Sequence, residues 1–209
     1  FGKWGLGIVP SEGNPLKQGF DTFFGYNSQF RAHRRYPAFL WQDNQKVPIP
    51  ENGNYEHQVV YGEDLIQEKI LDYIGKQNAQ KPFFMWLTYT LPHAELVVPN
   101  DSIYQQYQHL PKRPYKGHDY SGITDKPFGW AGYMSQPDTY GTYAAMVSRL
   151  DWYVGQIHKA LKAKELEDDT IIIFASDNGA HREGGADPKF FNSSAGLRGI
   201  KRDLYEGGI

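Results

Sequence analysis

Two adjacent side chains near the end of the chain, Asp177 and Asn178, offer a carboxylate and an amide oxygen on a predicted loop. Hard divalent cations such as calcium prefer oxygen ligands of this kind. The apolar run of residues 170–175 precedes the pair, and Gly179 follows it. An Asp-Asn-Gly sequence is also typical of a turn in which both side chains bond the local backbone. The residue types alone therefore leave two interpretations open, a metal site and a turn.

A glycine-rich, basic segment, residues 181–202, comes next in the chain. Glycine allows a backbone to approach a ligand closely. Within this segment Lys201 offers a compact point charge for an anion, and Arg198 or Arg202 offers a planar fork of donors. His181 is close enough in the sequence to the Asp-Asn pair to contact the same ligand. The alternative for each of these side chains is a solvated basic loop.

Two earlier residues could act on the same anion. His93 follows the apolar run 82–90 and a proline. A histidine with a pKa near neutrality can donate to an anion or protonate a leaving group. Lys3 adds a second positive charge within a glycine-rich segment at the start of the chain. Each of them, taken alone, is equally compatible with an ordinary loop residue.

The elements that must position these residues can be predicted from hydrophobic periodicity. Residues 61–76 and 139–164 carry apolar side chains at spacings of three and four, which predicts two helices. A short helix is expected near residues 102–108. The runs 82–90 and 170–175 are continuously apolar, which predicts strands buried on both faces.

The order helix, buried strand, polar loop thus occurs twice. It predicts an α/β architecture with a mostly parallel central sheet. In such sheets ligands bind at the carboxyl ends of the strands. His93 and the pair Asp177 and Asn178 both follow a predicted strand, so we expect them to lie at the same edge.

Composition excludes several classes of protein. The formal net charge of −2 argues against a general nucleic-acid binder. No apolar run approaches the roughly 20 residues that a membrane-spanning helix needs. The chain has no cysteine, so neither a disulfide nor a thiolate metal site can form within it. Aromatic residues make up 15% of the chain and suit either a core or the binding of sugar rings.

Five segments together resemble the type I sulfatase (arylsulfatase) family of the alkaline phosphatase superfamily. They occur in the family's order, and the resemblance covers essentially the whole chain. The segments are Gly2-Lys3-Trp4-Gly5-Leu6-Gly7, Gly19 to Tyr26, Pro82-Phe83-Phe84 leading to Pro92-His93, Ser176-Asp177-Asn178-Gly179, and Leu197-Arg198-Gly199 through Lys201 to Gly208.

The resemblance implies an alkaline-phosphatase-like α/β fold with a mixed, mostly parallel sheet flanked by helices. It implies that residues 1–209 are the central part of a sulfatase catalytic domain, incomplete at both ends. The family's nucleophile is a formylglycine made from a Cys or Ser in a Cys/Ser-x-Pro-x-Arg motif, which is expected upstream of Lys3. We therefore expect this fragment alone to be inactive. A periplasmic or secreted location is expected on the same ground.

For the site, the resemblance implies hydrolysis of a sulfate ester. Calcium would be held partly by Asp177 and Asn178, and the sulfate would be contacted by Lys3, His93 and Lys201. His93, helped by Lys201, is the expected proton donor to the leaving group. Substrate-binding roles are expected for His33, Arg198 and His181.

One position departs from the family pattern. Many members have histidine where this chain has Gly5, and His33 is a candidate to replace it or to recognise sugar. The segment 32–41 resembles sulfatases that act on polysaccharides, so the expected partner is a small-molecule or oligosaccharide sulfate ester. The alternatives are a phosphatase or phosphonate hydrolase of the same superfamily, and a non-catalytic carbohydrate- or anion-binding derivative.

Overall fold

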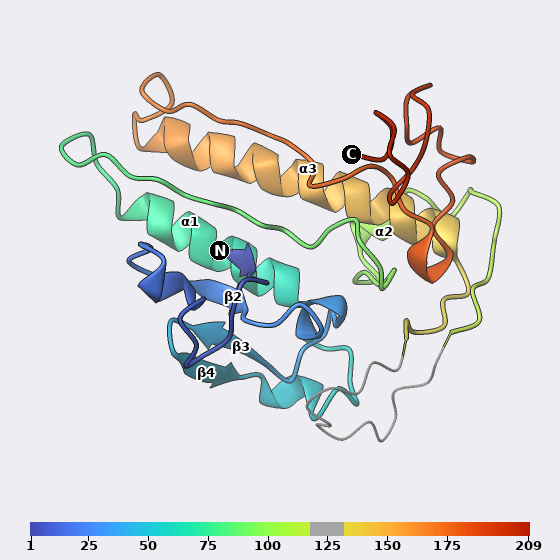
Figure 1. The fold of residues 1–209 in the computed structure, drawn as a ribbon, viewed down its shortest axis with the longest axis horizontal. Helices are drawn as coiled ribbons and strands as arrows, with labels where there is room; N and C mark the ends of the chain where they lie inside the picture. Colours follow the sequence, from blue (N-terminus) through green and yellow to red (C-terminus); the bar gives the residue numbers. More distant parts are fainter. Residues whose placement is uncertain (118–131) are drawn as a thin grey trace.

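A four-stranded mixed sheet forms one layer of the molecule. The computed structural model describes residues 1–117 and 132–209. The first two strands pair in parallel, and the other two ladders are antiparallel. This confirms the predicted α/β class with a mixed sheet (Figure 1). The strands, in their order across the sheet, are β1 (Gly2–Lys3), β2 (Phe24–Tyr26), β3 (Phe39–Gln42) and β4 (Gln45–Pro48).

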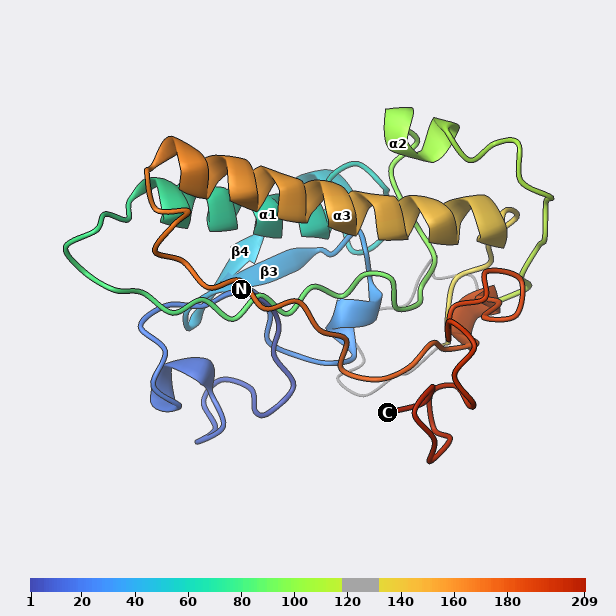
Figure 2. The same ribbon diagram turned by 90° about the horizontal axis from the view of Figure 1, so that it is seen from above.

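Two long helices form the second layer. They are α1 (Gly62–Gly75) and α3 (Thr139–Ala163), and both confirm the periodicity of the sequence. Figure 2 shows them side by side above the strands, with α1 in contact with both α3 and β2. The shorter elements are α2 (Ser102–Gln105), close to the predicted short helix, and the 3₁₀ turns η1 (Pro15–Lys17), η2 (Arg31–His33), η3 (Pro50–Asn52) and η4 (Glu183–Gly185).

The core lies between the helices and the sheet. Ile66, Ile70 and Ile74 follow one another at intervals of four along α1, so they share one face, and all three are buried. They pack against Ile157 and Leu161 of α3 in the same cluster. Burying such a side chain stabilises the fold by about 1.5–3 kcal/mol. Among the described residues, no helix is both long and apolar enough to cross a membrane.

The predicted strand at 82–90 is wrong in its burial and in its pairing. The segment runs extended, but its only bridge to the part of the chain that the structure describes is a parallel one from Thr88 to Gly2. Phe83 and other odd-numbered residues pack on the core, whereas Phe84 on the opposite face is 75% exposed. Consecutive side chains of an extended chain point to opposite faces, and here only one face meets the helices.

The predicted buried strand at 170–175 is also wrong. The segment after α3 is not part of any ladder in the described structure. Its apolar side chains are exposed, and Ile171 reaches 89%. A continuous apolar run predicts burial only if other elements cover both faces, and residues 1–117 and 132–209 place none there.

Candidate active site

The position of Lys3 depends on a close approach of three backbone segments. Gly2 has φ +107°, and a Cβ there would lie 2.2 Å from the carbonyl oxygen of Thr88. A Cβ on Gly25 would lie 2.0 Å from the carbonyl oxygen of Gly2. Glycine at both positions lets β1 contact its two neighbours. The Lys3 N–H then donates to the Thr88 carbonyl at 2.8 Å.

His93 lies five residues beyond Thr88, in a turn closed by its own N–H donating to the Thr90 carbonyl at 2.9 Å. Its Nδ1 is 2.6 Å from the Ala94 carbonyl oxygen, which fixes the proton on Nδ1. Its Nε2 therefore accepts, and the Lys201 ammonium lies 3.1 Å away. The structure thus brings together two residues separated by 108 positions in the sequence.

The Lys201 backbone is attached to the loop that carries the oxygen ligands. Its N–H donates to the Ala180 carbonyl at 2.8 Å, two residues after Asn178. Gly179 in the same loop donates to the Gly208 carbonyl at 3.1 Å. The two carboxyl-end loops predicted from the sequence therefore meet.

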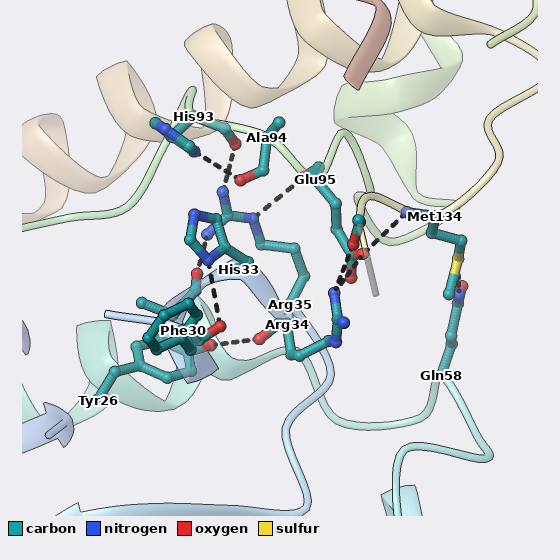
Figure 3. A network of polar contacts seen from close by, with 12 residues as sticks. Tyr26, Phe30, His33, Arg34, Arg35, Gln58, His93, Ala94, Glu95 and Met134 are labelled. Carbon is teal, nitrogen blue, oxygen red and sulfur yellow. Dashed lines mark hydrogen bonds and ion pairs between the residues drawn. The ribbon is translucent and has the colours of Figure 1, made fainter. Parts of the chain in front are cut away.

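Three imidazoles lie in a row at the site. The His93 ring centroid is 5.2 Å from that of His33 and 5.1 Å from that of His181, with which it stacks. Tyr133 lies edge-on to both His33 and His93. Figure 3 shows His33 and His93 approaching each other from separate segments.

All three imidazoles are held in the neutral form. Burial lowers the pKa of His93 to about 3, against a hydrogen bond to Ala94 that raises it, and the nearby Lys201 lowers it further. Burial likewise lowers the pKa of His33 to about 4, and it lowers the pKa of His181. His93 Nε2 therefore carries no proton and accepts the hydrogen bond from Lys201.

His181 is held by an acid and a backbone carbonyl. Its Nε2 donates to the Pro92 carbonyl at 3.1 Å, and its Nδ1 accepts from the Glu183 N–H at 3.1 Å. The Glu183 carboxylate forms an ion pair with Arg202 at 2.5 Å. Through Glu183 and His181, Arg202 is thus connected to Pro92, in the turn that carries His93.

Arg35 is a residue of the site that the sequence did not single out. It is 0% exposed and hydrogen-bonds to the backbone of the His93 turn (Figure 3). Three arginines stand within residues 31–35, and nothing in their sequence distinguishes the buried one. Glu183 was missed for a similar reason, because its role depends on contacts that are distant in the sequence.

The oxygen ligands Asp177 and Asn178 stand at the edge of this group. Asp177 is exposed, and its charge raises the pKa of Lys3, although burial of the ammonium has the larger, opposite effect and the net pKa is lowered. The described residues contain no cluster of three or more His, Cys, Asp or Glu that could hold a metal ion. The two side chains fit a hard cation in type, but calcium takes six to eight oxygens. They are at most part of such a site.

Arg198 does not join the histidines. Its guanidinium lies 3.8 Å from the centroid of the Tyr205 ring, and both side chains are exposed. A cation over an aromatic face is a favourable contact in itself. The expected substrate contact of Arg198 therefore receives no support from the geometry.

The family profile described as Sulfatase matches residues 1–209. Arylsulfatase J of Mus musculus is 26% identical, over 100% of this chain and 30% of the relative. N-acetylgalactosamine-6-sulfatase of Canis lupus familiaris is 29% identical, over 100% of this chain and 35% of the relative. The chain thus spans about a third of the length of these relatives.

A solved structure has the same fold. The crystal structure of Ps i-CgsB in complex with k-i-k-neocarrahexaose superposes with a TM-score of 0.65 at 24% identity. The match covers 99% of this chain and 41% of that one.

Proposed function

Because the chain belongs to the sulfatase family, we propose that it supplies the anion-binding and proton-donating part of a sulfate ester hydrolase site. The sulfate would be held by Lys3, His93 and Lys201 together with a divalent cation. The attacking formylglycine would come from a residue outside this chain. The observation that carries the proposal is the 3.1 Å contact between the Lys201 ammonium and His93 Nε2.

That contact supports a specific route for the proton. When the leaving group is a poor one, such as an alkyl or sugar hydroxyl, hydrolysis requires the bridging ester oxygen to gain a proton as its bond to sulfur breaks. Neutral His93 presents an unprotonated Nε2 to the Lys201 ammonium. A bound sulfate, being negative, would raise the pKa of His93 so that a proton can pass from Lys201 to Nε2 and on to the leaving oxygen. Lys3 would remain to neutralise the anion.

The divalent cation belongs to the same proposal. When bound, a calcium ion would polarise the sulfate oxygens as a Lewis acid. Asp177 and Asn178 would supply two of its oxygen ligands, and residues outside the described structure would supply the others. The charge of Asp177 raises the pKa of Lys3, so the two side chains lie near each other. This supports a site in which a cation held by Asp177 and the ammonium of Lys3 would contact the same sulfate.

A sulfated carbohydrate is the proposed substrate class. One relative is named N-acetylgalactosamine-6-sulfatase, and one structural neighbour was solved with k-i-k-neocarrahexaose. The rings of His33 and Tyr133 lie beside that of His93, and we propose that they contact the sugar next to the sulfate. The segment 118–131, whose aromatic residues Tyr120 and Trp130 are of a type that could also stack on sugar, lies outside the described residues.

The proton-donor role is tested by His93→Ala in the complete protein. We expect the rate for an alkyl or sugar sulfate, a poor leaving group, to fall by about 10²–10⁴-fold, the usual contribution of general acid catalysis. Nitrophenyl sulfate leaves readily without a proton, so its rate should fall far less. The measurement is kcat/KM for the two substrates side by side.

Equal losses on both substrates would remove the acid role from His93. Competition between sulfate and phosphate esters for the site distinguishes the proposed activity from that of a phosphatase or phosphonate hydrolase. A complete protein that binds sulfated sugar but hydrolyses neither ester would instead be a binding derivative.

The proposed calcium ligands Asp177 and Asn178 are tested by titrating the metal-free complete protein with calcium. Asp177→Ala should weaken calcium binding because it removes a charged ligand. The exposed Asp169, in the turn after α3, provides a matched control. An unchanged calcium affinity in Asp177→Ala would exclude this carboxylate as a ligand.

Two further expectations remain predictions. The assignment of residues 1–209 to the central part of a catalytic domain is tested by the gene sequence upstream of Phe1, where a Cys/Ser-x-Pro-x-Arg motif is expected. A periplasmic or secreted location is tested by fractionation of the source cells.

A further inference from the structure

The Arg35 guanidinium is the best-satisfied buried charge at the site. A guanidinium carries five N–H donors in a fixed plane. Five acceptors surround it. Nε donates to the Glu95 carbonyl at 3.2 Å, and Nη1 donates to the Ala32 carbonyl at 3.0 Å and to Thr90 Oγ1. Nη2 donates to the Thr90 carbonyl at 3.3 Å and to the His93 carbonyl.

These acceptors come from the two segments that carry the imidazoles. Ala32 directly precedes His33 in η2. The Thr90, His93 and Glu95 carbonyls belong to the turn that presents the His93 ring. One rigid plane therefore fixes the backbone of both segments, whose rings lie 5.2 Å apart.

A buried acid balances the charge of Arg35. Glu63, in the first turn of α1, is fully buried and lies 3.8 Å from the guanidinium. Thr90 Oγ1 accepts from Arg35 and donates to Glu63, so it bridges the two charges. Burial raises the pKa of Glu63, and the adjacent Arg35 opposes that rise. The network thus extends from the site into the core beneath α1.

We propose that Arg35 is a positioning residue of the site, which sets the distance and orientation between His33 and His93 without touching the substrate. The inference rests on the proposed sulfatase activity and adds a residue to it. Lysine cannot replace arginine here, because an ammonium donates from a single point and cannot span carbonyls on both segments. A displacement of about 1 Å in a catalytic group can cost about 10²-fold in rate.

The charge of Arg35 also acts on the imidazoles. It lowers the pKa of His33, His93 and His181, in each case after the larger effect of burial. The other charged groups that act on these rings are the cations Lys3, Arg34 and Lys201 and the acid Glu183. Arg35 supports neutral imidazoles from the core side, whereas Lys3 and Lys201 do so from the ligand side.

The test compares Arg35→Lys and Arg35→Met with matched variants at Arg149 in the complete protein. Arg149 is also a buried arginine, paired with Asp64 at 2.8 Å on the helices and absent from the site. The readout is the ratio of kcat/KM values for an alkyl sulfate and for nitrophenyl sulfate. A smaller folded population lowers both rates by the same factor and leaves this ratio unchanged, so the ratio reports on positioning.

We expect both Arg35 variants to lower the ratio about tenfold or more, since only the poor leaving group depends on the placement of His93. Arg149→Lys and Arg149→Met should lose stability without changing the ratio. An unchanged ratio in a folded Arg35 variant would overturn the inference. If neither Arg35 variant folds, Thr90→Val is measured in their place, because it removes one acceptor of the guanidinium. A lowered ratio of kcat/KM values then supports the inference, and an unchanged ratio overturns it.

The two hypotheses fail in different ways. If the complete unmodified protein hydrolyses no sulfate ester, the proposed function is wrong. The inference about Arg35 is then judged by the NMR resonances of the imidazoles, which must change in Arg35→Lys and not in Arg149→Lys. If the unmodified protein is active and the ratio is unchanged in the Arg35 variants, only the inference is wrong.

Discussion

At the scale of single residues, the site keeps basic side chains uncharged among cations. His181 is buried, His33 and His93 are half-buried, and cations approach all three from several sides. Such a group of neutral bases and fixed positive charges is suited to receive an anion, because the anion reverses the local potential. Protonation of His93 then becomes favourable only when the anion is present.

The lowered pKa values of His33 and His93 predict that the stability of the protein depends on pH. The pKa of His33 is about 4 and that of His93 about 3 in the folded protein, below the ordinary value of 6.5. Between these values the unfolded chain binds protons that the folded protein does not, so acid favours unfolding. We expect the free energy of unfolding to decrease as the pH falls from 6.5 towards 4. Denaturant titrations at a series of pH values measure it.

Replacement of His93 by asparagine should make that pH dependence shallower. His109, an exposed histidine beyond α2, provides the control, and His109→Asn should leave the slope unchanged. The interpretation of His93 as a buried neutral base fails if the two variants have the same slope as the unmodified protein.

The sequence identified some of these residues and not others. Lys3, His93 and Lys201 were recognisable because each belongs to a motif in the family's order. Arg35 and Glu183 carry no local signal. Their importance follows from burial and from partners that lie far away in the sequence, such as Glu95 for Arg35.

At the scale of elements, hydrophobic periodicity correctly predicted the two long helices, because each packs one apolar face on the core. Helices α1 and α3 bury one stripe each, and their bounds agree with the prediction to within one or two residues. The runs 82–90 and 170–175 were predicted less well, because an apolar run does not specify which elements cover it. The prediction that their carboxyl ends converge was still useful, since His93 and the Asp177 loop meet through Lys201.

At the scale of the whole molecule, the two extended segments 82–90 and 170–175 each carry exposed apolar side chains. Ile171, Ile173 and Phe174 are all more than 70% exposed in one short stretch. Phe84, on the segment 82–90, is exposed to a similar degree. Large contiguous apolar patches are uncommon on soluble monomers and usually mark a surface that contacts something else.

A polypeptide of only these 209 residues should therefore bind apolar dyes strongly and associate as its concentration rises, because water-exposed apolar area favours contact between copies. Fluorescence with an apolar dye and sedimentation at several concentrations measure the two effects. The double variant Ile171→Glu and Ile173→Glu should reduce both. Val147→Glu changes a single exposed residue on α3 and should reduce neither. If the polypeptide stays monomeric and does not bind the dye, the apolar side chains of the extended segments are covered within the 209 residues themselves.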